Sequence, residues 1–202
     1  MNTVLTLHDP ELAAGYKAAG VWRDETLYGM LAKHAAEQPD RYALRDGYRR
    51  LTWRQLLAWV DSVADDLDEA GVRRGQRVSV WLPNRVEAVV VFLACARNGY
   101  VCNPSLHQNY TVAEISGLLE RVNCAALFAQ TGYGADADRA DVFTAARNLP
   151  SMKRICRLEP YGGRWCGADR AKSNSGAWRS RPDPNRDARF LRSGDIMKET
   201  KE

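Results

Sequence analysis

Two pairs of closely spaced glycines are the first residues of this chain whose types suggest nucleotide chemistry. Gly71 precedes Gly75 by four positions, and Gly132 precedes Gly134 by two. A phosphate-binding loop needs Lys and then Ser or Thr after its last glycine, and Gly75 is followed by Gln and Arg. The second pair lacks the G-x-G-x-x-G spacing of a dinucleotide site at a strand–helix junction. We therefore interpret Gly71 and Gly75 as a helix stop and a turn, and we exclude a dinucleotide fingerprint.

The cysteines and histidines are the other residues that could bind a metal or act as a nucleophile. The cysteine count is odd, and no two cysteines have the C-x-x-C spacing. The five cysteines are Cys95, Cys102, Cys124, Cys156 and Cys166. The first three lie in apolar segments, which indicates buried, reduced thiols. His34 extends the apolar face of a predicted helix, and His107 lies in a polar loop without a Cys or carboxylate partner. We predict no catalytic, cofactor-binding or metal-binding residue on this chain.

The first half of the chain predicts helices around a short hairpin. Apolar residues recur at helical spacing over residues 26–36, and extended pieces at 42–44 and 50–52 flank the turn Asp46-Gly47. Thr52 and Gln55 form a capping box for the next helix. The apolar stripe of that helix has a period of 3.6 residues and consists of Leu56, Leu57, Val60, Val63, Ala64 and Leu67. Gly71 fits the left-handed position that closes the helix.

The second half predicts strands that alternate with helices. Residues 77–82 alternate as a strand, residues 86–97 are apolar on nearly all sides as in a buried helix, and residues 100–103 form a short strand. Such a βαβ unit has parallel strands and a right-handed crossover. Thr111 and Glu114 form a second capping box. A strand at 125–129, a helix at 138–148 and a strand at 154–158 complete an α/β fold with a mainly parallel sheet.

Three segments together resemble a known family. Residues 51–56, residues 71–84 and residues 92–104, which end in Asn103-Pro104, have the order and spacing of the first two core motifs of AMP-forming acyl-CoA synthetases. The resemblance covers roughly residues 25–158. It implies a partial N-terminal domain of an adenylate-forming enzyme, most similar to cyclohexanecarboxylate–CoA ligase or medium-chain acyl-CoA ligases.

The family reaction converts ATP, a carboxylic acid and CoA to acyl-CoA, AMP and pyrophosphate. The resemblance implies ATP, Mg²⁺ and CoA as family cofactors, held by a Ser-, Thr- and Gly-rich phosphate loop, a carboxylate and a lysine. In the corresponding region only Ser193-Gly194 echoes the loop. We interpret this echo as coincidence, so no cofactor is assigned to this chain. In an intact relative, the loop that contains His107 would border the acyl-CoA groove.

Composition divides the chain into a lead-in at 1–24, a partial AMP-dependent synthetase/ligase domain at 25–160 and an irregular tail at 161–202. The tail has 10 basic and 6 acidic residues, whereas residues 1–160 have 19 of each. Residues 1–160 therefore have no excess of positive charge that would indicate binding to nucleic acid. The tail is rich in Gly, Arg, Ser, Asp and Pro, which predicts disorder and suggests out-of-frame translation of GC-rich DNA.

The resulting functional expectation is a truncated AMP-dependent synthetase/ligase of fatty acid metabolism that is inactive alone. One alternative is a non-catalytic scaffold or binding module that completes a split enzyme with a second chain, and another is an inert remnant. Self-association is also expected, because a sheet that ends early leaves apolar surface uncovered. The longest apolar run, Ala88 to Ala96, is too short to span a membrane. We expect a cytoplasmic protein.

Overall fold

The computed structural model describes residues 9–104, 107–161 and 197–199. The N-terminal part contains α1 (Pro10–Ala18), α2 (Leu27–Glu37), a hairpin of β1 (Tyr42–Arg45) and β2 (Arg50–Thr52), and α3 (Trp53–Glu69). The remaining elements are β3 (Arg77–Trp81), α4 (Val86–Asn98), β4 (Val101–Pro104), α5 (Val112–Arg121), β5 (Cys124–Gln130), α6 (Val142–Arg147), β6 (Arg154–Leu158) and β7 (Met197–Glu199). The predicted α/β class is confirmed.

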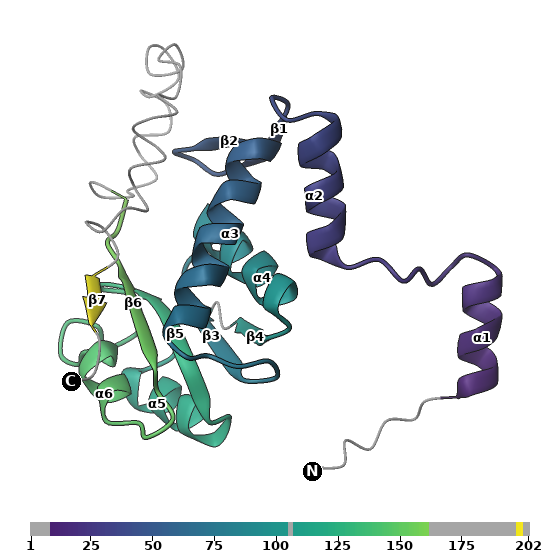
Figure 1. The fold of residues 1–202 in the computed structure, drawn as a ribbon. Coiled ribbons are helices and arrows are strands. Elements are labelled where there is room, and N and C mark those ends of the chain that lie inside the picture. The colour runs from purple at the N-terminus through teal and green to yellow at the C-terminus, as the bar shows by residue number, and fades with distance from the viewer. Residues whose placement is uncertain (1–8, 105–106, 162–196, 200–202) are drawn as a thin grey trace.

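One five-stranded sheet organises the body (Figure 1). Its strand order is β4-β3-β5-β6-β7. The first four strands are parallel, and β7 pairs antiparallel with β6. The chain leaves β3 toward β4 on one side and then crosses back to β5 on the other side, so the winding direction reverses between β3 and β5.

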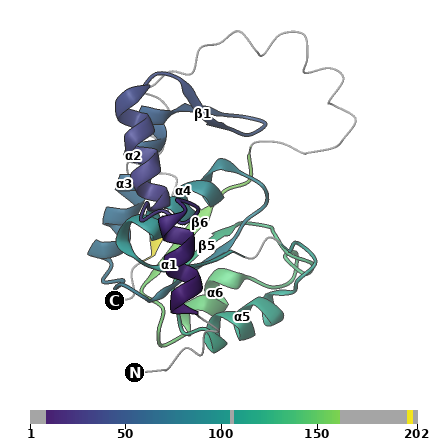
Figure 2. The same cartoon turned by 90° about the vertical axis from the view of Figure 1, so that its right-hand side faces the viewer.

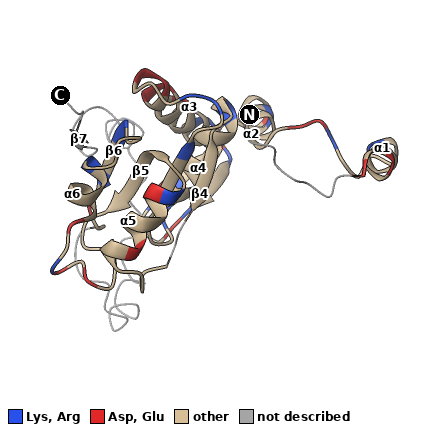
Figure 3. Ribbon diagram, turned by 90° about the horizontal axis from the view of Figure 1, so that it is seen from below, with Lys and Arg blue, Asp and Glu red and all other residues tan. Residues whose placement is uncertain are grey.

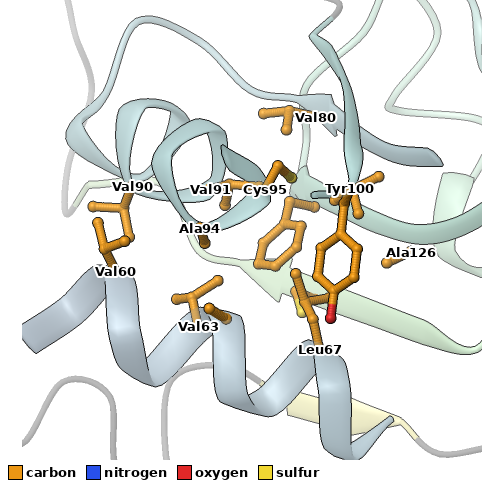
Figure 4. Close-up of a cluster of buried hydrophobic side chains, with 14 of the residues drawn as sticks. Val60, Val63, Leu67, Val80, Val90, Val91, Ala94, Cys95, Tyr100 and Ala126 are labelled. Atoms are coloured by element: carbon orange, nitrogen blue, oxygen red, sulfur yellow. The ribbon is translucent and has the colours of Figure 1, made fainter. Parts of the chain in front are cut away.

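Alternation along the strands creates a hydrophobic core on each face of the sheet. Val78 and Val80 point to the cluster formed with α3 and α4, which also includes Val60, Leu67 and Val91 (Figure 4). Trp81 and Leu127 belong to the opposite cluster, formed with α5 and α6. Because successive side chains of a strand alternate between faces, a short strand supplies both cores.

The helix ends confirm the predicted caps. The side chains of Thr52 and Thr111 each accept a hydrogen bond from the backbone N–H of the residue three positions later. The side chains of Gln55 and Glu114 in turn accept the backbone N–H groups of these threonines. Gly71 has φ +80° just after α3, in the left-handed region that closes a helix. The predicted hairpin also forms, with Tyr42 opposite Thr52 and Arg45 opposite Arg50.

Three predicted elements differ in detail from the structure. The helix expected at 138–148 is α6, which begins only at Val142, because the side chain of Asp141 caps it by accepting the N–H groups of Phe143 and Thr144. The helix predicted to be apolar on nearly all sides, α4, leaves Val89 and Phe92 exposed, in line with the uncovered apolar surface expected of a sheet that ends early, and it also buries Glu87. The lead-in at 1–24 contains the helix α1, which stands apart from the body in two perpendicular views (Figures 1 and 3).

The body continues slightly past its predicted end at residue 160. Tyr161, the first residue of the predicted tail, is half-buried and hydrogen-bonds to the body. Residues 197–199 of the same segment form β7. Residues 162–196 and 200–202 lie outside the described residues, and so do the predictions of disorder and of an out-of-frame origin that concern them.

Candidate functional site

The carboxyl ends of β3, β5 and β6 lie side by side in the sheet, of which Figure 2 shows β5 and β6 as neighbours. Hydrogen bonds join the segments at these strand ends. In open α/β sheets, ligands bind outside the carboxyl ends of the strands, at the point where the winding direction reverses. Here that point lies between β3 and β5. Arg85 follows β3, Gln130 ends β5 and Glu159 follows β6. This edge of the sheet is therefore where a site is expected.

Arg85 is the centre of a buried charged network at this edge. Its side chain is 3% exposed and forms a two-pronged ion pair with Glu87, with Nε to Oε2 and Nη2 to Oε1 both at 2.9 Å. Its Nη1 donates to Gln130 Oε1 at 2.7 Å and to the backbone oxygen of Glu159 at 3.0 Å. One guanidinium thus joins the beginning of α4 to the ends of β5 and β6.

The hairpin turn contributes a second carboxylate to the network. One oxygen of Asp46 accepts the backbone N–H groups of Tyr48 and Arg49, and the other accepts the N–H of Val86 at 3.2 Å. Arg49 reaches Glu87 Oε1 at 2.9 Å. The turn that was predicted from Asp46-Gly47 is therefore bonded to the beginning of α4, and this connects the two-stranded sheet to the five-stranded one.

Tyr161 covers the network. Its hydroxyl lies 2.7 Å from Asp46 Oδ2 and 2.8 Å from Glu87 Oε2, so its one proton is shared between two carboxylates. Its ring stacks on Tyr48 at 4.5 Å between centroids and lies 4.3 Å from the guanidinium carbon of Arg85. Burial and the negative charge of Glu87 raise the pKa of the Tyr161 hydroxyl, which stays protonated and acts as a donor.

Both carboxylates of the network remain ionised at neutral pH. Burial opposes the ionisation of Glu87, but hydrogen bonds from Arg85 and the charges of Arg49 and Arg85 outweigh it and lower its pKa below 4.5. Burial likewise opposes ionisation of Asp46, and the hydrogen bonds from Tyr48, Tyr161 and the neighbouring N–H groups lower its pKa below 3.8. Two guanidinium groups thus face two carboxylates, and their charges balance.

These pKa shifts predict how stability depends on pH. A carboxyl whose pKa is lower in the folded than in the unfolded state stabilises the fold above its unfolded pKa, and this contribution is lost as pH falls through the folded-state value. We expect the free energy of unfolding to fall between about pH 5 and pH 2, measured by urea denaturation. An Asp46→Asn variant should show a shallower fall, because position 46 no longer titrates. Equal slopes for the two proteins would contradict this assignment.

A cavity of about 190 Å³ lies on the other side of the same sheet edge, between β3, β4 and α5. Its wall is mainly apolar and includes Trp81, Leu118 and Leu127. Ser79 and Asn103 contribute polar atoms, but the Ser79 hydroxyl already accepts hydrogen bonds from Asn103 and from the Cys124 thiol. No Asp or Glu is among the described residues that line the cavity, so these residues supply no carboxylate for acid–base chemistry.

Cys95 and Cys102 have side chains that lie close enough to interact, but the other described residues that the sequence singled out are not brought together. His34 stacks on Trp53 at 4.7 Å between centroids and hydrogen-bonds to Gln38, as expected of a packed histidine. His107 lines the cavity. Cys95, Cys124 and Cys156 are buried, and Cys102 is partly buried. Ser193-Gly194 and Cys166 lie outside the described residues. Among the described residues, no cluster of His, Cys, Asp and Glu could hold a metal.

Sequence reasoning missed the network and the ion pairs of α3. Asp66 pairs with the buried Arg154 at 2.7 Å, and Asp61 and Asp65 both pair with Arg97. The one available signal for the network was Arg85-x-Glu87, a pair of charges directly before an apolar helix. Its partners Asp46 and Tyr161 are far away in sequence and carry no local pattern.

The donor set of the network does not fit a nucleotide or Mg²⁺. Every oxygen of Asp46 and Glu87 already accepts a hydrogen bond from an N–H or hydroxyl donor. The Arg85 guanidinium, which would otherwise suit a phosphate, is occupied by Glu87, Gln130 and the Glu159 carbonyl. Binding a phosphate or a metal here would require breaking these bonds. The arrangement stabilises the sheet edge and does not provide reactive groups.

The strand order and the reversal between β3 and β5 define an open, doubly wound α/β domain. The sequence profile of the family described as "AMP-binding enzyme" matches residues 31–188. This match covers more than half of the chain, and the chain therefore belongs to the AMP-binding enzyme family. The match runs beyond Tyr161 into the segment that the composition separates as a tail.

Several relatives act on carboxylic acids, according to their names. The chain is 33% identical over 145 residues to 2-hydroxy-7-methoxy-5-methyl-1-naphthoate–CoA ligase of Streptomyces carzinostaticus. This alignment covers 72% of this chain and 26% of the relative. It is 26% identical over 160 residues to the medium-chain fatty-acid–CoA ligase of Escherichia coli K12, covering 79% and 28%. The apo structure of Mycobacterium smegmatis MbtA superposes with a TM-score of 0.59 at 29% identity, covering 76% and 28%.

The chain thus aligns with about a quarter of the length of these curated relatives. The fold expected from the resemblance, a portion of an adenylate-forming enzyme, is confirmed by the family match and by the superposition. Among the described residues, no helix combines the length and the apolar character needed to cross a membrane.

Proposed function

We propose that this chain supplies the N-terminal scaffold of an AMP-forming acid–thiol ligase and does not itself adenylate acids. The family reaction joins a carboxylic acid to CoA with conversion of ATP to AMP and pyrophosphate. The observation that supports a scaffold role is the closed network at the sheet edge. Arg85, Glu87 and Asp46 bond to one another and to Tyr161, so they hold strand ends in place and leave no group free for the reaction.

The acid substrate of the proposed ligase is a carboxylic acid with an apolar body. The names of the relatives include a naphthoate ligase and a medium-chain fatty-acid ligase, which supports aromatic and aliphatic acids alike. ATP, Mg²⁺ and CoA would bind to parts of the ligase other than the network described above. Reduced thiols at Cys95 and Cys124 support a cytoplasmic location for this function, within fatty acid or aryl acid metabolism.

A second proposal is that the chain completes a split enzyme with a separate polypeptide. The exposed apolar residues Val89, Phe92 and Val101 favour it, because they lie on an edge strand and its neighbouring helix, where another part of the fold would pack. A module of this kind would be inactive alone and active when its partner is present.

Acid-dependent exchange of pyrophosphate into ATP tests the proposed lack of adenylation. We expect no exchange by the purified 202-residue chain with aliphatic, alicyclic or aromatic acids. The medium-chain fatty-acid–CoA ligase of E. coli serves as the active control in the same assay. Exchange that depends on both the acid and this chain would overturn the proposal. Exchange that appears only after a second polypeptide is added would support the split enzyme.

A further inference from the structure

An apolar arm precedes the body of the domain. It consists of residues 9–25 and contains α1. Leu12, Tyr16, Val21 and Trp22 are between 38% and 67% exposed, although all four are large and hydrophobic. The ring of Trp22 lies 5.2 Å from that of Tyr16, and the backbone N–H groups of Val21 and Trp22 donate to the carbonyl of Tyr16. These contacts fold the connector back onto the helix and keep the aromatic pair together.

The arm is bonded only to itself within the described part of the chain. The hydrogen bonds and ion pairs of residues 9–25 all stay within that range, as Lys17–Asp24 and Arg23–Glu25 do. Figure 3 shows α1 at the end of its connector, away from the sheet and its helices. Isolated helices shorter than about 12–15 residues are marginal in water, and α1 has 9 residues. A stable α1 therefore needs a surface to pack on.

Five large apolar side chains on neighbouring elements of the body lack a cover within the described residues. We call the exposed side chains of Leu27, Met30, Val89, Phe92 and Val101 the acceptor surface, and they are between 38% and 49% exposed. They come from α2, α4 and β4, three elements of which α4 contacts both others. Val89 and Phe92 are three residues apart on α4, as are Leu27 and Met30 on α2, so each pair shares one helix face.

The charges around these two regions are complementary. The arm has four acidic and two basic residues, a net charge of −2. Three exposed cations border the acceptor surface, Lys33 on α2, Arg74 beside Gly99 at the end of α4, and Arg77, which is paired with Val101 across β3 and β4. None of the three forms an ion pair with another described residue. An acidic apolar arm therefore matches an apolar surface with a basic rim.

We propose that two copies of this chain exchange their arms. In this dimer, α1 and Trp22 of one copy pack on the acceptor surface of the other. Each copy offers one arm and one acceptor surface, so a two-fold axis satisfies both at once and forms a closed dimer. In the structure α1 stands apart from the body of its own copy, which leaves it free to reach the partner's surface (Figures 1 and 3).

The mass of the full chain in solution tests this proposal, by light scattering after size-exclusion chromatography. We expect the wild-type chain to have twice the mass of one chain, and Trp22→Asp and Phe92→Asp to reduce it to that of a monomer. Tyr42→Asp is the matched control, because Tyr42 is a 63% exposed aromatic residue on β1, outside both regions, and should leave the dimer intact. Circular dichroism of each variant establishes that the body remains folded.

Mixing the two variants and varying the salt concentration then test the arm and the acceptor surface separately. Trp22→Asp retains an acceptor surface and Phe92→Asp retains an arm, so their mixture should recover dimers that neither forms alone. Because exposed charges are screened by salt, the wild-type dimer should dissociate more readily at high salt than at low salt. Changing Lys33, Arg74 and Arg77 to Glu should weaken the dimer at low salt, because the rim then repels the acidic arm. A monomeric wild-type chain would overturn the proposal, as would a dimer that persists in Trp22→Asp. The measurement needs no activity, so it can fail independently of the proposed function.

Discussion

Replacing Glu87 with Gln is expected to cost about 3–5 kcal/mol of the free energy of unfolding, because removing one partner of a buried ion pair leaves the other charge uncompensated. The Arg85 side chain is 3% exposed and cannot turn to water when its partner becomes neutral. Arg49 loses the same carboxylate. A loss of this size is a large share of the 5–15 kcal/mol typical of a domain, so the midpoint of urea denaturation should fall strongly.

Glu120→Gln is the control for this change. Glu120 is exposed on α5, and the same removal of a negative charge should alter the free energy of unfolding by less than about 0.5 kcal/mol. If Glu87→Gln has an effect as small as the control, water reaches the network, and the network does not stabilise the sheet edge.

Trp81→Ala is expected to cost about 3–5 kcal/mol, the range found when a large aromatic side chain is removed from a core. Trp81 is 1% exposed at the end of β3, packs edge-on against Tyr133, and donates its indole N–H to the carbonyl of His107 at 3.2 Å. A Cβ at Gly134 would lie 2.7 Å from the Trp81 ring, which shows how closely the backbone follows the indole. Removing the ring leaves a void that a backbone held by several contacts cannot fill.

Trp81→Phe separates packing from hydrogen bonding in this prediction. Phe keeps an aromatic ring but leaves the His107 carbonyl without its donor, so we expect a loss of about 1–3 kcal/mol. Thermal unfolding followed by circular dichroism measures both variants. If the Phe variant unfolds at the same temperature as the Ala variant, the hydrogen bond and not the ring dominates at this position.

Local patterns were sufficient to predict most of the elements of this fold. The capping boxes at Thr52 and Thr111 involve residues three positions apart, and the strand at 154–158 is the one observed. Such signals depend on neighbouring residues, which is why sequence reasoning finds them. The parallel sheet also follows from the alternation of strands and helices, because a right-handed crossover leaves few other arrangements.

The network and α1 could not be predicted for different physical reasons. The network joins Asp46, Arg85, Gln130 and Tyr161, and their proximity depends on the strand order, which local periodicity does not encode. The helix α1 is short, and its apolar residues are few and have no cover on the body, so its pattern was too weak to distinguish it from a loop. The sequence indicated that some apolar surface would stay uncovered but not which side chains of α4 would be exposed, because burial depends on what packs there and not on the helix itself.

The position of Tyr161 has a consequence for the order in which the domain assembles during synthesis. Asp46 finds this hydroxyl partner 115 residues further along the chain, and Glu87 finds it 74 residues along. Contacts between residues so distant in sequence slow folding, because a long loop must close before they form. While a ribosome is still making the residues before Tyr161, the hairpin turn and the beginning of α4 lack their common donor. The Val86 amide, which donates to Asp46, should therefore become protected from hydrogen exchange late in folding, when the hairpin turn binds to the beginning of α4.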